Sequence, residues 1–415
     1  VLNLPEWNGL SIRGAFLHDQ RDGDVKNVAP RRAYVYPDPY GTFKSPKSLD
    51  GRNSEGYFLA ARYTGIENLT VTYKFDFNSA RESVLIQGMG LPPNLTGAIE
   101  ASLVQRQAGT SLLSFDKLDK VAVDGAAFYA RAGGHSLTMD YKLSDSVTLK
   151  SISAYRRTRT RGISDLDGSD FRPNPAIENT YYCLSCALAY MKQKQFSQEF
   201  QGIVESKWVD LIGGLYYFYE EADYRAPLVS TSSYFAAGSL TGKTLSGVLP
   251  NPLSVTDIRS GTFDRTNHTS YAVYGHANFH LTDRLDVALG GRITDDNKKN
   301  EHYFAAANAY APLKYNKRKG SYDASANFEL TDDVKLYARY AKGYLSGGYL
   351  GGTLYEPENT RSIEGGVKSE WFNRRLLVNA NLFKVHTKDL QVGGFSGVTG
   401  VFLTNIGTFD SKGFE

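Results

Sequence analysis

Hydrophobic and polar residues alternate along several long stretches of this chain. In residues 270–281 the odd positions carry Tyr, Val, Gly, Ala, Phe and Leu, whereas the even positions are mostly polar or small. After a polar turn at 282–284 the alternation resumes over residues 285–293. Successive side chains of an extended strand point to opposite faces. The pattern therefore predicts a hairpin of two long strands with one apolar face.

The same alternation recurs along the chain, and we expect about 14 strands. Short polar turns join the strands of each pair. Between the pairs lie long stretches rich in Gly, Ser, Asn, Pro and Tyr, which we interpret as loops. The further strands are predicted at 69–77, 136–142, 147–155, 195–204, 209–219, 327–331, 334–342, 362–368 and 376–385, and the loops at about 79–132, 160–190, 222–266, 296–318, 345–360 and 390–400.

Long strands with one apolar face, short turns at one rim and long loops at the other are typical of outer-membrane barrels. Loops of this length are unusual in compact domains and normally functional. A soluble sandwich has shorter strands, and its apolar outer face would aggregate without lipid. We therefore predict an all-β fold, an antiparallel transmembrane β-barrel with long extracellular loops and short periplasmic turns.

The composition of the chain argues against membrane helices, nucleic-acid binding and enzyme activity. The 415 residues are 41% hydrophobic with a mean hydropathy of −0.38, and no stretch approaches the ~18 apolar residues of a membrane helix. The 28 Tyr, 22 Phe and 3 Trp suit membrane interfaces. The net charge of +3 has no dense basic run behind it, so we expect no nucleic-acid binding. The chain also lacks the serine elbow, phosphate-loop and zinc-helix motifs, so we expect no enzyme activity and no cofactor.

Several short motifs resemble one family. Residues 355–358 (YEPE) followed by 362–368 (SIEGGVK) are similar to the "PE…ExGxK" signature of TonB-dependent outer-membrane receptors. Residues 405–407 and 413–415 are similar to the "NxG…GxE" strand of the same family. Further matches occur, in order, over about residues 130–415. The chain is thereby identified as a member of that receptor family.

The resemblance implies a barrel of about 22 strands with a plugged lumen. Residues 1–415 would form part of that barrel domain. We expect the plug domain and TonB box outside this chain, upstream of Val1, and roughly six further strands after Glu415. The residues that contact the TonB complex would then lie in the plug.

The resemblance also implies active uptake of a scarce ligand across the bacterial outer membrane, most often a ferric siderophore. Haem, cobalamin, nickel complexes and oligosaccharides are the other ligands of the family. Two alternatives stay open from the residues alone. One is a passive porin without a plug, and the other is an adhesive barrel that transports nothing.

Tyrosine-rich loops are candidates for ligand contact. Residues 344–355 combine several glycines, which give backbone freedom, with aromatic rings, which give contact area. Packing within the loop or in the aromatic girdle is the alternative role. The ligand-loop candidates are Tyr181, Tyr182, Tyr344, Tyr349 and Tyr355.

The two cysteines of the chain, Cys183 and Cys186, lie in a predicted surface loop. A CxxC pair can be a redox motif or half of a zinc site. No second pair and no thioredoxin-like pattern accompany it. At an oxidising cell surface a local disulfide is the favoured interpretation.

Three arginines, Arg157, Arg159 and Arg161, continue the outward parity of Val147 and Leu149 beyond the expected lipid crossing. Arginine is suited to phosphate groups. We hypothesise that these arginines contact lipopolysaccharide, with a solvated strand extension as the alternative.

Four polar residues are predicted on the lumen face. His276 and His280 share it, but four residues along a strand span about 13 Å, too far to bind one metal ion. Glu364 and Lys368 share a strand face that the resemblance makes internal, so they are candidates for contact with the plug. Ordinary polar lining of the lumen is the alternative for all four.

Overall fold

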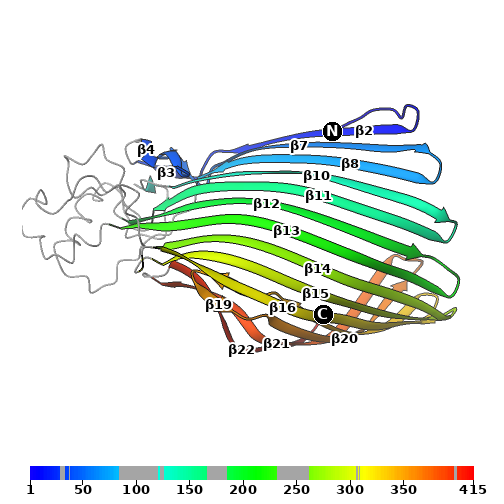
Figure 1. Ribbon diagram of the computed structural model, residues 1–415. Helices are drawn as coiled ribbons and strands as arrows, with labels where there is room; N and C mark the ends of the chain where they lie inside the picture. Colours follow the sequence, from blue (N-terminus) through cyan, green and yellow to red (C-terminus); the bar gives the residue numbers. More distant parts are fainter. Residues whose placement is uncertain are drawn as a thin grey trace, which may run out of the picture.

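One antiparallel sheet dominates the computed structural model (Figure 1). The structure describes residues 1–28, 33–36, 38–83, 120–121, 126–165, 185–230, 261–304, 307, 309–396 and 400–415. Within these ranges no helix is long and apolar enough to cross a membrane.

The sheet contains a two-residue edge strand, β1, and fourteen longer strands, each hydrogen-bonded to its neighbour. This confirms the predicted strand number. In spatial order the strands are β1 (Leu2–Asn3), β2 (Leu10–Arg21), β7 (Arg52–Ile66), β8 (Leu69–Glu82), β10 (Ala126–Ser144), β11 (Val147–Asp165), β12 (Ser185–Val204), β13 (Val209–Ser230), β14 (Gly261–Thr282), β15 (Leu285–Phe304), β16 (Ala309–Thr331), β17 (Val334–Leu345), β20 (Glu358–Trp371), β21 (Leu376–Ser396) and β22 (Gly400–Phe414).

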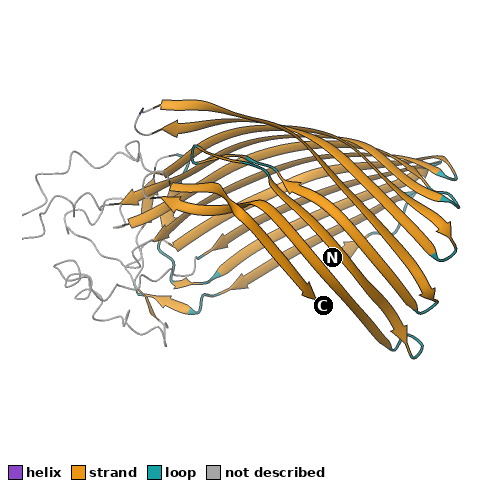
Figure 2. Ribbon diagram, turned by 90° about the horizontal axis from the view of Figure 1, so that it is seen from below, coloured by secondary structure: helices purple, strands orange, loops and turns teal. Residues whose placement is uncertain are grey.

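Small sheets accompany the large one. They are β6–β3–β9 (Ser48–Leu49, Val25–Asn27 and Lys120–Val121), β4–β5 (Ala33–Tyr36 and Gly41–Lys44) and β18–β19 (Gly348–Leu350 and Thr353–Tyr355). The large sheet curves strongly, but β1 and β22 stand at its two ends and do not pair with each other (Figure 2). The described strands therefore form an open wall of a barrel.

The apolar residues of the long strands gather on one face of this wall. Leu215, Val273 and Ile293 lie side by side on β13, β14 and β15, and their exposed fractions are 60%, 52% and 54%. Aliphatic side chains this exposed in a continuous band need lipid around them. This face is the outside of the barrel.

The predicted loop at 296–318 is wrong. β15 continues to Phe304 and β16 begins at Ala309, and the ladder pairs Asn297 with Asn316 and Lys299 with Lys314. Similarly, the region 345–360 holds the β18–β19 hairpin and β21 runs on to Ser396. Beyond the lipid both faces are polar, so the strand pattern vanishes from the sequence while the backbone ladder continues.

All three tryptophans of the chain lie at the rim of short turns. Trp7 precedes β2, Trp208 precedes β13 and Trp371 ends β20. Their exposed fractions are 72%, 68% and 50%. Tryptophan collects at membrane interfaces, so this rim marks one edge of the lipid layer.

Candidate functional site

A hairpin at residues 345–356, here called the mouth hairpin, is bound to the inner face of β15 and β16. The Lys298 ammonium donates to the Gly347 carbonyl at 2.6 Å, and the Asn300 amide donates to the Tyr349 carbonyl at 3.2 Å. The Gly347 N–H donates to the Tyr315 hydroxyl at 3.1 Å. Buried side chains of the barrel wall thus satisfy the backbone of the hairpin.

The tip of the mouth hairpin is held by a buried Asp–His pair. Gly351 donates its N–H to Asp264 Oδ2 at 2.9 Å, while Asp264 Oδ1 lies 2.9 Å from His302 Nδ1. Gly352 has a φ of +74°, and a Cβ there would sit 2.7 Å from His302 Cδ2. Only glycine fits both this backbone and this space.

The base of the mouth hairpin is fastened on the other side, by β21 and β22. The Gln391 amide donates to the carbonyls of Ser346 and Glu356 at 3.2 and 3.0 Å. Asn405 donates to the Glu356 carbonyl at 2.9 Å and accepts from its N–H at 2.7 Å. The hairpin therefore links wall strands on both sides of its own position, and is an ordered element rather than the flexible loop expected from its glycines.

A buried carboxylate adjoins the mouth hairpin. Asp296 lies beyond Ile293, the last outward apolar residue of β15, and is 5% exposed. Burial alone raises the pKa of Asp296, but hydrogen bonds from His268, Ser270 and Ser346 outweigh it and lower the pKa to about 2. Burial lowers the pKa of Lys298. The wall beside the mouth hairpin thus carries a negative charge on Asp296 and a positive charge on Lys298.

The tyrosine candidates divide into two groups. Tyr344 donates to Asp296 Oδ2 at 3.4 Å, and Tyr349 and Tyr355 lie half-buried on the mouth hairpin. Burial raises the pKa of Tyr344 and of Tyr355, so both hydroxyls stay protonated donors. Tyr181, Tyr182 and Cys183 lie outside the described residues, as does the side chain of Cys186. Their roles, including the disulfide, stay predictions.

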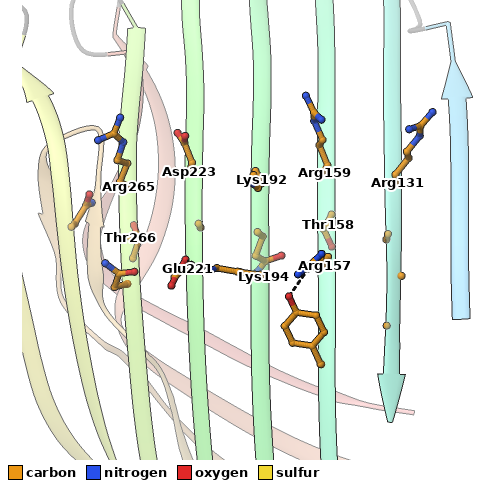
Figure 3. A pocket seen from close by; sticks show the side chains of 18 of the residues that line it. Arg131, Arg157, Thr158, Arg159, Lys192, Lys194, Glu221, Asp223, Arg265 and Thr266 are labelled. Carbon is orange, nitrogen blue, oxygen red and sulfur yellow. Dashed lines mark hydrogen bonds and ion pairs between the residues drawn. The ribbon is translucent and has the colours of Figure 1, made fainter. Parts of the chain in front are cut away.

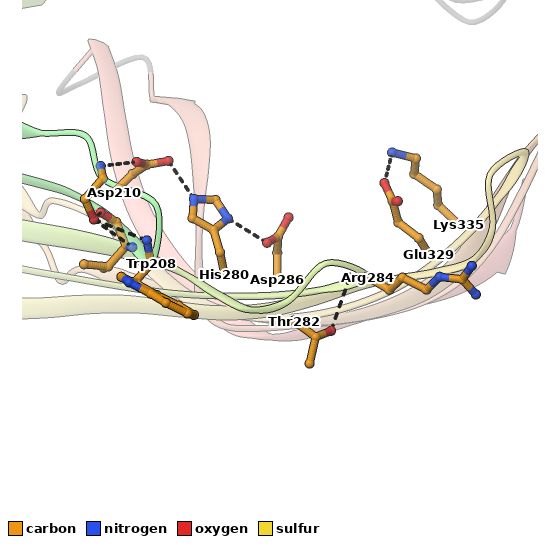
Figure 4. Close-up of polar contacts among 10 residues, drawn as sticks. Trp208, Asp210, His280, Thr282, Arg284, Asp286, Glu329 and Lys335 are labelled. Atoms are coloured by element: carbon orange, nitrogen blue, oxygen red, sulfur yellow. Dashed lines mark hydrogen bonds and ion pairs between the residues drawn. The ribbon is translucent and has the colours of Figure 1, made fainter. Parts of the chain in front are cut away.

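His280, a lumen candidate near the short-turn rim, lies on the inner, concave face (Figure 4). His280 bridges two carboxylates, with Nδ1 at 2.8 Å from Asp286 and Nε2 at 3.1 Å from Asp210. Beside it, Glu329 pairs with Lys335. Trp208 points to the opposite side of the sheet (Figure 4). Sequence reasoning placed His280 on this face but missed both carboxylate partners.

The other lumen candidates have different surroundings. His276 is exposed on the inner face. Glu364 accepts a hydrogen bond from Tyr337, and the Lys368 ammonium lies 5.3 Å from the centre of the Tyr337 ring. Among the described residues no three His, Cys, Asp or Glu side chains are grouped as metal ligands. Contact of these side chains with a plug stays a prediction.

The three arginines of β11 separate into exposed and covered members. Arg157 and Arg159 are exposed on the lipid-side face of β11 (Figure 3). The Arg161 guanidinium donates to the Tyr40 carbonyl at 2.9 Å and lies over the rings of Phe43 and Tyr129. Residues near β5 therefore partly cover Arg161, which leaves Arg157 and Arg159 accessible.

Comparison with known proteins agrees with this architecture. The profile described as "TonB dependent receptor-like, beta-barrel" matches residues 7–415. The chain belongs to the TonB-dependent receptor β-barrel family. Barrels of this family are bacterial outer-membrane proteins, and the proteins similar to this chain are receptors and transporters, not enzymes.

Among relatives, the pesticin receptor of Yersinia pestis is 31% identical over 160 residues, which is 36% of this chain and 23% of that receptor. The ferric-pyoverdine M114 receptor PbuA of Pseudomonas sp. (strain M114) is 28% identical over 151 residues, 35% of this chain and 18% of that receptor. The matched segments thus cover less than a quarter of either receptor.

Two solved structures share the fold. The ferric yersiniabactin uptake receptor FyuA from Yersinia pestis superposes with a TM-score of 0.67 at 17% identity, covering 99% of this chain and 54% of that one. The siderophore receptor PiuA from Acinetobacter baumannii gives 0.65 at 14% identity, covering 99% and 57%. The TonB-dependent receptor chain described here therefore spans about half the length of these receptors.

Proposed function

We propose that this barrel belongs to a receptor that takes up a ferric siderophore by TonB-dependent active transport. The family match over residues 7–415 carries the proposal. The names of the similar proteins, a ferric-pyoverdine receptor and a ferric yersiniabactin uptake receptor, point to the ligand class.

The mouth hairpin supports a role in ligand capture. It folds against the inner wall at the rim opposite the short turns, where a ligand from outside enters the lumen. Tyr349 and Tyr355 offer aromatic surface there, and the half-buried Lys298 supplies positive charge beside it. A ferric siderophore with aromatic or anionic groups matches both features.

Partners follow from the same proposal. TonB would act through a plug domain held outside residues 1–415, and the inward Glu364, Lys368, His276 and His280 are proposed to face that plug. Arg157 and Arg159 are proposed to contact the lipopolysaccharide of the outer leaflet. A passive porin or an adhesive barrel predicts neither accumulation of ligand nor dependence on TonB.

Iron uptake by a deletion strain tests the proposal. Iron-starved cells that lack the receptor gene would be complemented with the whole gene and supplied with ⁵⁵Fe bound to catecholate, hydroxamate or phenolate siderophores in turn. We expect one class to be accumulated only by complemented cells. Equal accumulation of every class with and without the gene would contradict the proposal.

Two variants of the mouth hairpin and one control variant test where the siderophore binds. Tyr349→Ala and Tyr355→Ala remove aromatic surface from the mouth hairpin and are expected to weaken siderophore binding by roughly ten- to a hundredfold, as loss of a contact aromatic does at binding sites. Tyr322→Ala, on the lipid-side face of β16, is the control and should bind like the unchanged receptor.

A further inference from the structure

Basic side chains form two parallel rows on the lipid-side face, just beyond the apolar band. In the row nearer the lipid, the strand ladder places Arg157 opposite Lys194 and Lys299 opposite Lys314. In the next row Arg159 stands between Arg131 and Lys192 on the adjacent strands. These rows, here called the basic belt, cross β10 to β16, and Figure 3 shows their part on β10 to β14.

The belt carries a strong excess of positive charge. Its eight basic residues face three carboxylates, whereas the whole chain has 47 basic and 44 acidic residues. Each carboxylate has a basic partner. The residues are Arg131, Arg157, Arg159, Lys192, Lys194, Arg265, Lys299 and Lys314, with Glu221 bound to Lys194 at 2.7 Å, Asp223 to Arg225 at 2.6 Å and Glu301 to Arg265 at 3.8 Å.

Six belt cations have no carboxylate partner within the part of the chain that the structure describes: Arg131, Arg157, Arg159, Lys192, Lys299 and Lys314. Like charges directly opposite each other destabilise a sheet. Here four such pairs stand in the two rows: Arg157–Lys194 and Lys299–Lys314 in the first, Arg131–Arg159 and Arg159–Lys192 in the second. An anion bound between them would remove the repulsion, and guanidinium groups match phosphate oxygens in geometry.

The height of the belt fits a lipid headgroup. From Leu281 to Tyr271, both exposed on the lipid side, β14 advances about 33 Å at about 3.3 Å per residue. A strand tilt of about 45° turns this into about 23 Å across the membrane, close to the ~25 Å apolar band of outer-membrane barrels. Asn267 and Arg265 lie four and six residues beyond Tyr271 on the same face, above the apolar band and at the side of the outer-leaflet headgroups.

From this we infer that the basic belt is a binding site for the phosphate groups of lipid A, the phosphorylated glycolipid of the outer leaflet. The inference extends the proposed lipopolysaccharide contact from two arginines of β11 to a surface over seven strands. It rests on the outer-membrane location of the barrel and not on which ligand is transported.

The test compares two quadruple-substitution variants with the unchanged receptor, all as the whole receptor purified from outer membranes in mild detergent. The belt variant carries Arg131→Gln, Arg157→Gln, Arg159→Gln and Lys192→Gln. The control carries Lys207→Gln, Arg284→Gln, Arg374→Gln and Arg375→Gln at the short-turn rim. We expect native mass spectrometry to find at least about tenfold less lipid A per barrel on the belt variant, and an unchanged amount on the control. Equal lipid A on all three proteins would overturn the inference.

Titration of delipidated protein separates the sources of the anion. Bisphosphorylated lipid A should raise the melting temperature of the unchanged receptor and not of the belt variant. Neither enzymatically dephosphorylated lipid A nor inorganic phosphate, at equal concentration, should raise the melting temperature of the unchanged receptor. If dephosphorylated lipid A acts equally, acyl chains alone are bound, and if inorganic phosphate acts equally, the site takes a free anion; either result refutes a lipid A site. Uptake by the same variants reports on transport separately.

Discussion

Gly351 and Asp264 are 87 residues apart in the sequence, yet the glycine N–H donates to the buried aspartate at 2.9 Å. The bond joins the tip of the mouth hairpin to the inner wall of β14. Because the same aspartate also contacts His302 at 2.9 Å, one carboxylate fixes both the wall and the hairpin. The position of the hairpin at the mouth therefore depends on a few buried polar groups.

Replacing Gly352 with alanine should release the mouth hairpin. The φ of +74° and the 2.7 Å approach to His302 Cδ2 leave no room for a Cβ, and the left-handed backbone alone costs about 1–2 kcal/mol. We expect hydrogen exchange of the amides at 345–356 to accelerate about tenfold, since 1.4 kcal/mol corresponds to a factor of ten.

Gly343→Ala is the matched control for that measurement. Gly343 lies in β17, and a Cβ built there has no neighbour within 4 Å. Its exchange pattern should match the unchanged protein. Equal exchange in both variants would show that Gly352 does not hold the hairpin.

Asp296 should stabilise the mouth over an unusually wide pH range. Its pKa falls from the ordinary 3.8 to about 2 on folding. A carboxyl with a lowered folded pKa contributes stability that is fully present above about pH 4 and is lost as pH falls through about 2. Asp296→Asn should therefore lower the melting temperature at pH 6.

The same comparison at pH 2 provides the check. At that pH the aspartate contribution has largely gone, so the melting temperatures of Asp296→Asn and the unchanged protein should approach each other. Using the difference between two proteins cancels the titration of all other carboxyls. A difference that stays constant from pH 6 to pH 2 would rule out this role for Asp296.

The bridge from His280 to Asp210 and Asp286 should stabilise the wall near the short-turn rim. His280→Leu leaves two carboxylates without their shared partner. Because His280 and both carboxylates are partly exposed, we expect only a small loss of stability, measured as a lower midpoint of urea unfolding in detergent micelles. His276→Leu removes an exposed histidine of the same face and should cost much less. Equal losses would mean that the bridge contributes nothing.

The tryptophans should report the inner edge of the lipid layer. Trp208 and Trp371 end the apolar band at the short-turn rim and are 68% and 50% exposed. In bilayers, lipids brominated near the headgroup should quench these residues more than lipids brominated near the chain ends. The contribution of each tryptophan is the quenching that disappears in Trp208→Phe or Trp371→Phe. Stronger quenching by the lipids brominated near the chain ends would place the rim inside the hydrocarbon.

The sequence predicts the wall well where lipid imposes a period of two. The odd residues of β14 between 271 and 281 face lipid, as their pattern indicates. Above the lipid the alternation of apolar and polar residues ends, because both faces of β15 and β16 are polar there. The sequence pattern therefore predicts a loop where the ladder in fact continues from Asn297 to Phe304.

The sites depend on register and on contacts between distant residues. Arg157 and Arg159 could be predicted from the parity of β11 alone. Their neighbours Arg131 and Lys192 follow only from knowing which residues the strand ladder sets opposite each other. Similarly, glycines suggested a mobile loop at 344–355, because no local pattern shows that Asp264, Lys298 and Gln391 bind it.

Accumulation of ferric siderophore that depends on the proton gradient and on TonB distinguishes active uptake from passive passage. Cells that carry the whole receptor would be given the ⁵⁵Fe-siderophore selected by the uptake screen, with and without a protonophore and in a strain without TonB. We expect binding at the cell surface to persist in all cases, while accumulation inside requires both the proton gradient and TonB. Accumulation that continues without either would show a passive pore and refute TonB-dependent uptake by this receptor.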